Sequence, residues 1–103
     1  MVAMVNDPAT GNASAGTGDP AGDTALMLRV RAADQAAFRQ LVDRHLAGVL
    51  AVARRILRDD AEAEDIAQEV MLRLWRQAEG LEVGSAGIGG WLRRVASNLS
   101  IDR

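Results

Sequence analysis

The sequence predicts a small all-α protein, in which a bundle of about four helices follows a disordered N-terminal tail. Apolar residues recur at three- and four-residue steps through most of residues 24–103, and no segment alternates as a strand does. Residues 1–22 differ, since they combine four glycines and two prolines with polar residues and have no apolar period. The 103 residues therefore predict a tail over residues 1–22 and one domain over residues 23–103.

The first two helices are predicted from their caps and their apolar faces. Asp23 is expected to cap a helix over about residues 24–32, because its side chain can accept a hydrogen bond from an unpaired backbone N–H. Leu26, Met27 and Val30 give this helix a short apolar face. Asp34 is expected to cap a second helix that ends near Arg58. Its buried face is predicted to comprise Phe38, Leu41, Val42, His45, Val49, Val52, Ala53 and Ile56.

A third helix is predicted from Asp59 or Asp60 to about Ala78, with Glu62 at the capping-box position if Asp59 is the cap. Its expected buried stripe is Ala63, Ile66, Ala67, Val70, Leu74 and Ala78, widened by Met71 and Trp75. Five glycines in residues 79–90 predict a loop. A fourth helix is expected from about Gly90 to the chain end. Its inward residues are predicted to be Leu92, Val95, Ala96 and Leu99.

The composition argues against an enzyme and against a cofactor or metal site. The absence of cysteine excludes disulfides, thiolate metal ligands and cysteine nucleophiles. His45, the only histidine, lies on an apolar stripe without a partner ligand, so a structural role is predicted. The glycine-rich loop lacks the Lys-Ser/Thr of a phosphate-binding loop. With no spanning apolar run and no signal peptide, a cytoplasmic protein is expected.

Charge is balanced overall but uneven along the chain. Residues 23–103 hold twelve acids and twelve arginines, which does not favour a general polyanion-binding surface. Residues 59–69, however, contain six acids and no base. The helix dipole favours acids only in the first turn, so this segment predicts a face that docks on a basic partner; a solvated helix start is the alternative. Arg94, Ser97 and Asn98 share another helix face, for which a solvated surface is again the alternative. Trp75 and Trp91 are predicted to be core residues, with base stacking as the alternative for Trp91.

Two strings, AEAEDIAQEVMLRLWRQ (residues 61–77) and WLRRVASNLSIDR (residues 91–103), resemble the second conserved region of bacterial RNA polymerase sigma factors. The resemblance is to the extracytoplasmic-function (ECF) group and covers about residues 23–103 in the same order and spacing. The two strings together form a far more specific signal than either string alone. Asp34, the Ala37-Phe38 pair and Leu41 fit the opening helices of that group.

The resemblance implies a binding module that melts promoters and performs no catalysis. The third helix would dock on the clamp helices of the largest subunit of core RNA polymerase. The residues implied for this contact are Glu64, Asp65, Gln68, Glu69 and Arg73. The loop 79–90 and the fourth helix would contact the non-template strand of the minus-ten promoter element. The residues implied there are Trp91, Arg93, Arg94, Ser97, Asn98 and Arg103.

The resemblance also implies a further partner, and the residues leave one alternative function open. The family is often controlled by anti-sigma proteins, so such a protein is a candidate partner. The chain stops at Arg103 inside a helical pattern, which predicts a piece of a longer protein. The resemblance implies that this longer protein has a second DNA-reading domain. It has Ile88-Gly89-Gly90 where the family often has bulky residues, which leaves the base-capture contacts open. The alternative is a helical protein-interaction module, a regulator without a DNA role, which explains the acidic helix but not the Arg-Ser-Asn face.

Overall fold

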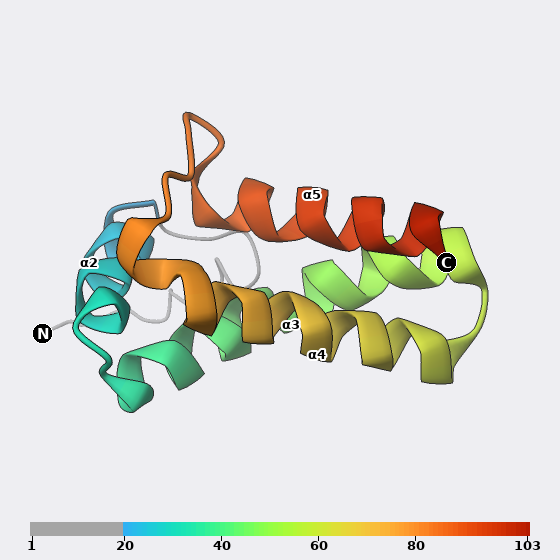
Figure 1. Ribbon diagram of the computed structural model, residues 1–103, viewed down its shortest axis with the longest axis horizontal. Helices are drawn as coiled ribbons and strands as arrows, with labels where there is room; N and C mark the ends of the chain where they lie inside the picture. The colour runs from blue at the N-terminus through green and yellow to red at the C-terminus, as the bar shows by residue number, and fades with distance from the viewer. Residues whose placement is uncertain (1–19) are drawn as a thin grey trace, which may run out of the picture.

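A computed structural model describes residues 20–103, so the predicted disorder of residues 1–19 lies outside the described residues. The described part of the chain is all-α and has no strand, as predicted. Helices α3, α4 and α5 run along the length of the molecule, and α2 lies at one end of them (Figure 1). The elements in order are α2 (Pro20–Arg31), α3 (Gln35–Leu57), α4 (Asp60–Gln77), the 3-10 helix η1 (Ala78–Gly80) and α5 (Gly87–Asp102).

Helix α2 begins at Pro20, so residues 20–22 are helical and the predicted cap at Asp23 is wrong. Proline suits a helix start because its φ is preset and its missing N–H would be unpaired there. Asp23 instead lies in the first turn and is buried. Its Oδ1 accepts a hydrogen bond from Arg44 at 2.9 Å, and its Oδ2 lies 3.0 Å from Nε2 of His45. The local pattern could not predict these contacts, because their partners lie on another helix.

Helix α3 has the predicted N-cap. The Asp34 side chain accepts a hydrogen bond from the backbone N–H of Ala37 at 3.1 Å. At the other end Arg58 takes a left-handed conformation with φ of 58°, and its N–H bonds to the carbonyl of Arg54. Ile56 was predicted to be buried but is 39% exposed. The buried residues of α3 follow strict four-residue steps that end at Ala53, and Ile56 lies three residues beyond, off that stripe.

Helix α4 follows the sequence prediction closely. The Asp59 side chain accepts a hydrogen bond from the N–H of Glu62 at 2.9 Å, which confirms Asp59 as the N-cap. Every residue of the predicted buried stripe is buried, and Met71 is buried beside it. Trp75 is half-buried and packs against the core.

Helix α5 begins at Gly87, three residues before the predicted start at Gly90. The predicted loop over residues 79–90 is therefore shorter, since η1 occupies its first residues and the first turn of α5 its last four. Ile88 explains this difference, because it is only 3% exposed and joins the core. Burial of a side chain of this size contributes about 1.5–3 kcal/mol, which offsets the roughly 1 kcal/mol that each glycine of this turn costs inside a helix.

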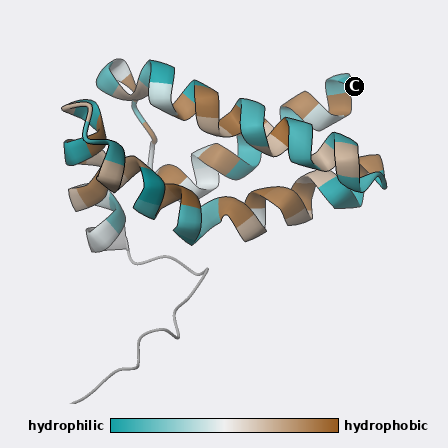
Figure 2. Ribbon diagram, turned by 90° about the horizontal axis from the view of Figure 1, so that it is seen from below, coloured by the Kyte–Doolittle hydropathy of each residue, from teal (hydrophilic) through white to brown (hydrophobic). Residues whose placement is uncertain are grey.

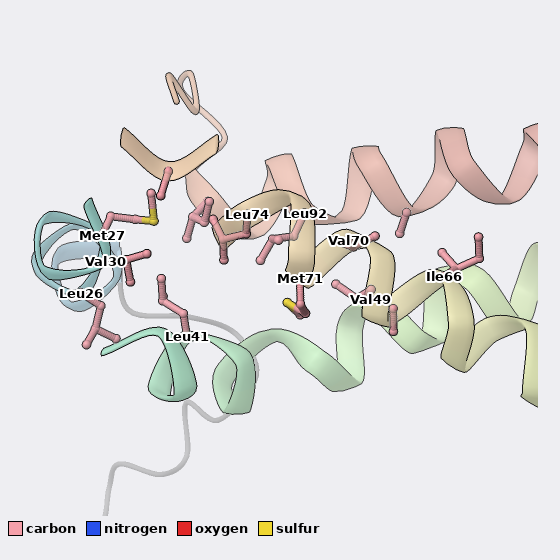
Figure 3. Close-up of a cluster of buried hydrophobic side chains, with 14 of the residues drawn as sticks. Leu26, Met27, Val30, Leu41, Val49, Ile66, Val70, Met71, Leu74 and Leu92 are labelled. Atoms are coloured by element: carbon pink, nitrogen blue, oxygen red, sulfur yellow. The ribbon is translucent and has the colours of Figure 1, made fainter. Parts of the chain in front are cut away.

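The core lies between α3, α4 and α5 and extends to α2. Leu41, Leu74 and Leu92 come from three different helices and are fully buried. Figure 3 shows these side chains converging in the interior, with Leu26 and Met27 of α2 at one end. Along each ribbon hydrophobic and hydrophilic residues alternate in short stretches, as expected for helices with one buried face (Figure 2).

The Asp34 cap predicts a measurable pH dependence. The N–H of Ala37 and then the Arg29 side chain, 3.0 Å away, lower the pKa of Asp34 below its ordinary value of 3.8. A carboxyl with a lowered folded-state pKa stabilises the fold above its unfolded pKa, and that contribution is lost as pH falls through the folded pKa. We expect the Ala37 amide resonance to titrate with a midpoint below 3.8.

The matched variant is Asp34→Asn, which keeps an acceptor for the Ala37 N–H but cannot titrate. The ordinary pKa of an aspartate is ~4. Below that pH, the unfolding free energy of this variant should depend less on pH than that of the unchanged chain. A midpoint at or above 3.8 for the Ala37 resonance would contradict the capping geometry.

Candidate functional site

The α4 residues implied in polymerase binding form one polar surface of that helix. Glu64, Asp65 and Gln68 are exposed. Glu69 and Arg73 are half-buried and pair with each other, with Nε of Arg73 3.2 Å from Oε2 of Glu69. A pair of this kind, one helical turn apart at the surface, contributes only about 0.3–0.5 kcal/mol. A partner surface can therefore break it at little cost and take either charge.

A groove runs beside this surface, between α3 and α4, with a volume of about 600 Å³. Glu64 and Gln68 line it from α4, and the exposed Arg39 and Asp43 line it from α3. Between these polar residues its wall is apolar. The apolar lining residues are Phe38, Val42, Leu46, Leu50, Ala67, Met71 and Leu72. The groove thus offers a partner helix an apolar strip between charged edges.

The groove was not predicted from the sequence, although a signal for it exists. Val42, Leu46 and Leu50 follow four-residue steps directly beside the buried stripe of α3, and all three are only partly buried. Leu72 on α4 is 45% exposed. A second apolar stripe next to a core stripe indicates surface that the bundle itself does not cover. At one end of the groove the rings of Phe38 and Trp75 pack with centroids 5.1 Å apart.

The α5 residues implied in DNA binding divide into separate groups. Arg94 and Asn98 are exposed, one turn apart, with the partly exposed Ser97 beside them, so these three share the outer face of α5. Arg93 is exposed on the side of α5 that faces α3, where its Cδ lies near Gly48. Trp91 is half-buried and packs against the core, which agrees with the prediction that it is a core residue.

Arg103 does not join the Arg94 group. Its NH1 lies 3.9 Å from Oε1 of Glu62, at the opposite end of α5 from the loop. Arg103 therefore lies beside the N-terminal end of α4, next to an acid outside the implied polymerase-binding set. The pair is exposed and at the limit of an ion-pair distance, so it adds little stability.

The loop before α5 and the first turn of α5 together depend on glycine at four positions. Gly84 and Gly87 have φ of 74°, a left-handed conformation that side chains rarely adopt. Gly89 lies close against the His45 ring, and a Cβ added at Gly89 would be 3.0 Å from Cε1 of His45. An added Cβ at Gly90 would overlap the Cβ of Ala86. The Ile88-Gly89-Gly90 string is thus explained by close packing at the start of α5.

Two features of other protein classes are not found among residues 20–103. No group of three or more His, Asp or Glu side chains there is arranged to hold a metal ion. Within the same residues no helix is both long and apolar enough to cross a membrane.

Comparison with known proteins gives one consistent result. A family model described as Sigma-70 region 2 matches residues 41–103. The chain is 34% identical over 79 residues to the ECF RNA polymerase sigma factor SigK of Mycobacterium tuberculosis (strain ATCC 25618 / H37Rv). The matched segment covers 77% of this chain and 42% of that protein. It is 39% identical over 71 residues to the ECF RNA polymerase sigma factor SigL of Mycobacterium tuberculosis (strain ATCC 35801 / TMC 107 / Erdman). This match covers 69% of this chain and 40% of that protein.

The chain therefore spans about two fifths of the length of these curated relatives. No solved structure matches it.

The left-handed glycine at the start of α5 can be tested by substitution. Gly87→Ala should lower the unfolding free energy by about 1–2 kcal/mol, because a Cβ disfavours the left-handed region by that amount. Gly80→Ala is the matched control, since Gly80 has no positive φ and an added Cβ there would have no neighbour within 4 Å. It should be neutral or slightly stabilising, by up to about 1 kcal/mol. If urea unfolding showed the same change in unfolding free energy for Gly87→Ala and Gly80→Ala, the left-handed conformation of Gly87 would be contradicted.

Proposed function

Because this chain belongs to the sigma-70 region 2 family, within the ECF group of sigma factors, we propose that it binds core RNA polymerase and recognises and melts the minus-ten promoter element. The observation that carries the proposal is the presence of two different exposed surfaces on two packed helices. One is the polar face of α4 with its apolar groove. The other is the outer face of α5, which follows directly from the loop 81–86.

The α4 surface suits a helical partner that carries basic residues. Asp65 and Glu69 supply negative charge, which steers association and fixes orientation. The groove supplies the apolar area on which affinity mostly depends. In this proposal the partner is the pair of clamp helices in the largest polymerase subunit, contacted by the α4 residues Glu64, Asp65, Gln68, Glu69 and Arg73.

The α5 surface suits a single strand better than a duplex. Opening a duplex requires only that the protein bind the open strand more tightly than the closed form. A flipped base costs a few kcal/mol of unstacking, which contacts to the base and its phosphates must offset. In this proposal the exposed Arg94 meets a phosphate, and Asn98, exposed one turn away, bonds to a base edge or the backbone. Arg103 would join them only after leaving Glu62, which costs little.

A protein-interaction module without a DNA role is the second candidate, and the groove between α3 and α4 is the observation that favours it. A helix of another protein would contact the same apolar strip and charged edges. The two functions differ in what they require of α5, because only promoter melting needs Arg94 and Asn98. Substitutions on α5 therefore separate the candidates, whereas substitutions on α4 affect both.

The α4 surface can be tested by charge reversal. The Asp65→Arg, Glu69→Arg double variant should weaken binding to core RNA polymerase by more than about 100-fold, because like charges brought together cost several kcal/mol. The measurement is affinity for purified core polymerase, with helicity followed by circular dichroism.

The control is the Glu79→Arg, Glu82→Arg double variant, which changes the net charge by the same amount at two exposed acids outside α4. It should bind core polymerase normally. Unchanged affinity of the Asp65→Arg, Glu69→Arg variant would refute the assignment of this surface.

The α5 surface can be tested on promoters that differ only in whether they are already open. With core polymerase and the chain in its complete parent protein, the Arg94→Ala, Asn98→Ala double variant should open duplex promoters slowly and recover on pre-melted ones. Arg94→Ala alone should reduce the slope of binding against salt by about one phosphate contact. Arg55→Ala, at an exposed arginine of α3, is the control. Normal opening of duplex promoters by the double variant would show that this face does not handle DNA.

A further inference from the structure

The loop 81–86 is held at both ends by side chains that do not belong to it. The first anchor is Arg31, the last residue of α2. Its Nε donates to the carbonyl of Ala78 at 3.2 Å, and its NH2 donates to the carbonyl of Leu81 at 2.9 Å. These two carbonyls stand at the two ends of the short 3-10 helix η1, which carries the chain out of α4. One rigid guanidinium thus fixes the direction in which the loop departs.

The second anchor is the His45 ring, which lies between α2 and the first turn of α5. On one side its Nε2 is 3.0 Å from Oδ2 of Asp23 in the first turn of α2. On the other side the ring lies so close to Gly89 that an added Cβ would be 3.2 Å from its Nδ1. Both His45 and Asp23 are buried. The start of α5 is therefore seated on a ring whose position α2 fixes.

Helix α2 is thus connected to both ends of the loop, through Arg31 at its last residue and Asp23 in its first turn. Figure 1 shows the same arrangement, with α2 at the end of the bundle from which the loop projects. Between the anchors, Glu82, Ser85 and Ala86 are exposed. The loop is closed near α5 by the N–H of Gly87 bonding to the carbonyl of Gly84.

We propose that α2 is a brace for the loop, with Arg31 and the Asp23–His45 pair as positioning residues that prepare the loop and the start of α5 for the opened strand. The inference rests on the proposed function of that surface. Fixing both ends of a short segment removes conformations before binding, which lowers the entropy lost when DNA is bound. Arg31 then affects the handling of DNA without touching it.

The test compares three variants on helix α2 itself. Arg31→Ala removes both bonds to the loop, and Arg31→Lys keeps the charge but not the planar fork. Arg29→Ala is the matched control, because Arg29 lies on the same helix and pairs with Asp34 instead of the loop. Amide hydrogen exchange of residues 81–90 should be about tenfold faster in Arg31→Ala. It should be intermediate in Arg31→Lys and unchanged in Arg29→Ala. Exchange in α3 should stay the same in all three.

The consequence for DNA is measured with core polymerase and the complete parent protein, as open-complex formation on duplex promoters whose minus-ten window is randomised. Arg31→Ala should broaden the sequence preference and weaken binding several-fold, with partial recovery in Arg31→Lys. Gly89→Ala, which presses on the second anchor, should also alter the preference. The Arg94→Ala, Asn98→Ala variant serves as a reference for direct contact.

The outcomes separate the brace from the function on which it rests. If the reference variant changes DNA binding and Arg31→Ala does not, the brace is wrong and the proposed function stands. If neither changes it, both are wrong. Unchanged exchange of residues 81–90 in Arg31→Ala overturns the brace whatever the DNA result.

Discussion

One stripe of α3 is the constraint on which the rest of the structure depends. Its buried residues follow four-residue steps, and α3 contacts α2, α4 and α5, the other α-helices of residues 20–103. The members of the stripe are Ala37, Leu41, His45, Val49 and Ala53. With this stripe committed to the core, the neighbouring stripe of Val42, Leu46 and Leu50 is left only partly covered. The core and the groove are thus two consequences of the same helix.

The one polar member of that stripe, His45, explains how a short helix finds its place. Leu26 and Val30 of α2 are buried, but Leu28 is 61% exposed, so apolar packing secures only part of that helix. A buried carboxylate without a hydrogen-bond partner is costly. Asp23 finds such partners where it meets His45 and Arg44, which fixes the position of α2 on α3. Polar contacts of this kind are directional, so they specify position where apolar contacts alone would allow several.

Local signals predicted those parts of the fold that depend on neighbouring residues. The caps at Asp34 and Asp59 act within three residues; Asp34 was predicted, and Asp59 was one of the two predicted candidates. The errors occurred where a distant residue decides. Asp23 resembles a cap until its partner on α3 is known, and the glycines at 87–90 resemble a loop until Ile88 is seen in the core.

The same distinction applies to the candidate site. Helical spacing correctly grouped Arg94 with Ser97 and Asn98 on one face, because that face is a property of a single helix. Spacing could not place Arg103 beside Glu62, nor reveal that α3 and α4 leave a groove between them. These are properties of two helices together, and the sequence pattern of either helix alone does not contain them.

The charge distribution suits a domain that in the proposed function reaches DNA on a larger enzyme. Residues 23–103 carry equal numbers of acids and arginines, so no long-range field would draw this part of the chain to DNA. Strong binding to any duplex would indeed oppose melting, because only the difference in affinity between open and closed strands drives opening. In the proposed function a few arginines beside the loop would supply that difference, while the acidic face of α4 would supply attachment to the enzyme. Because α4 and α5 pack directly on each other, attachment through α4 would, in the proposed function, fix where α5 meets the strand.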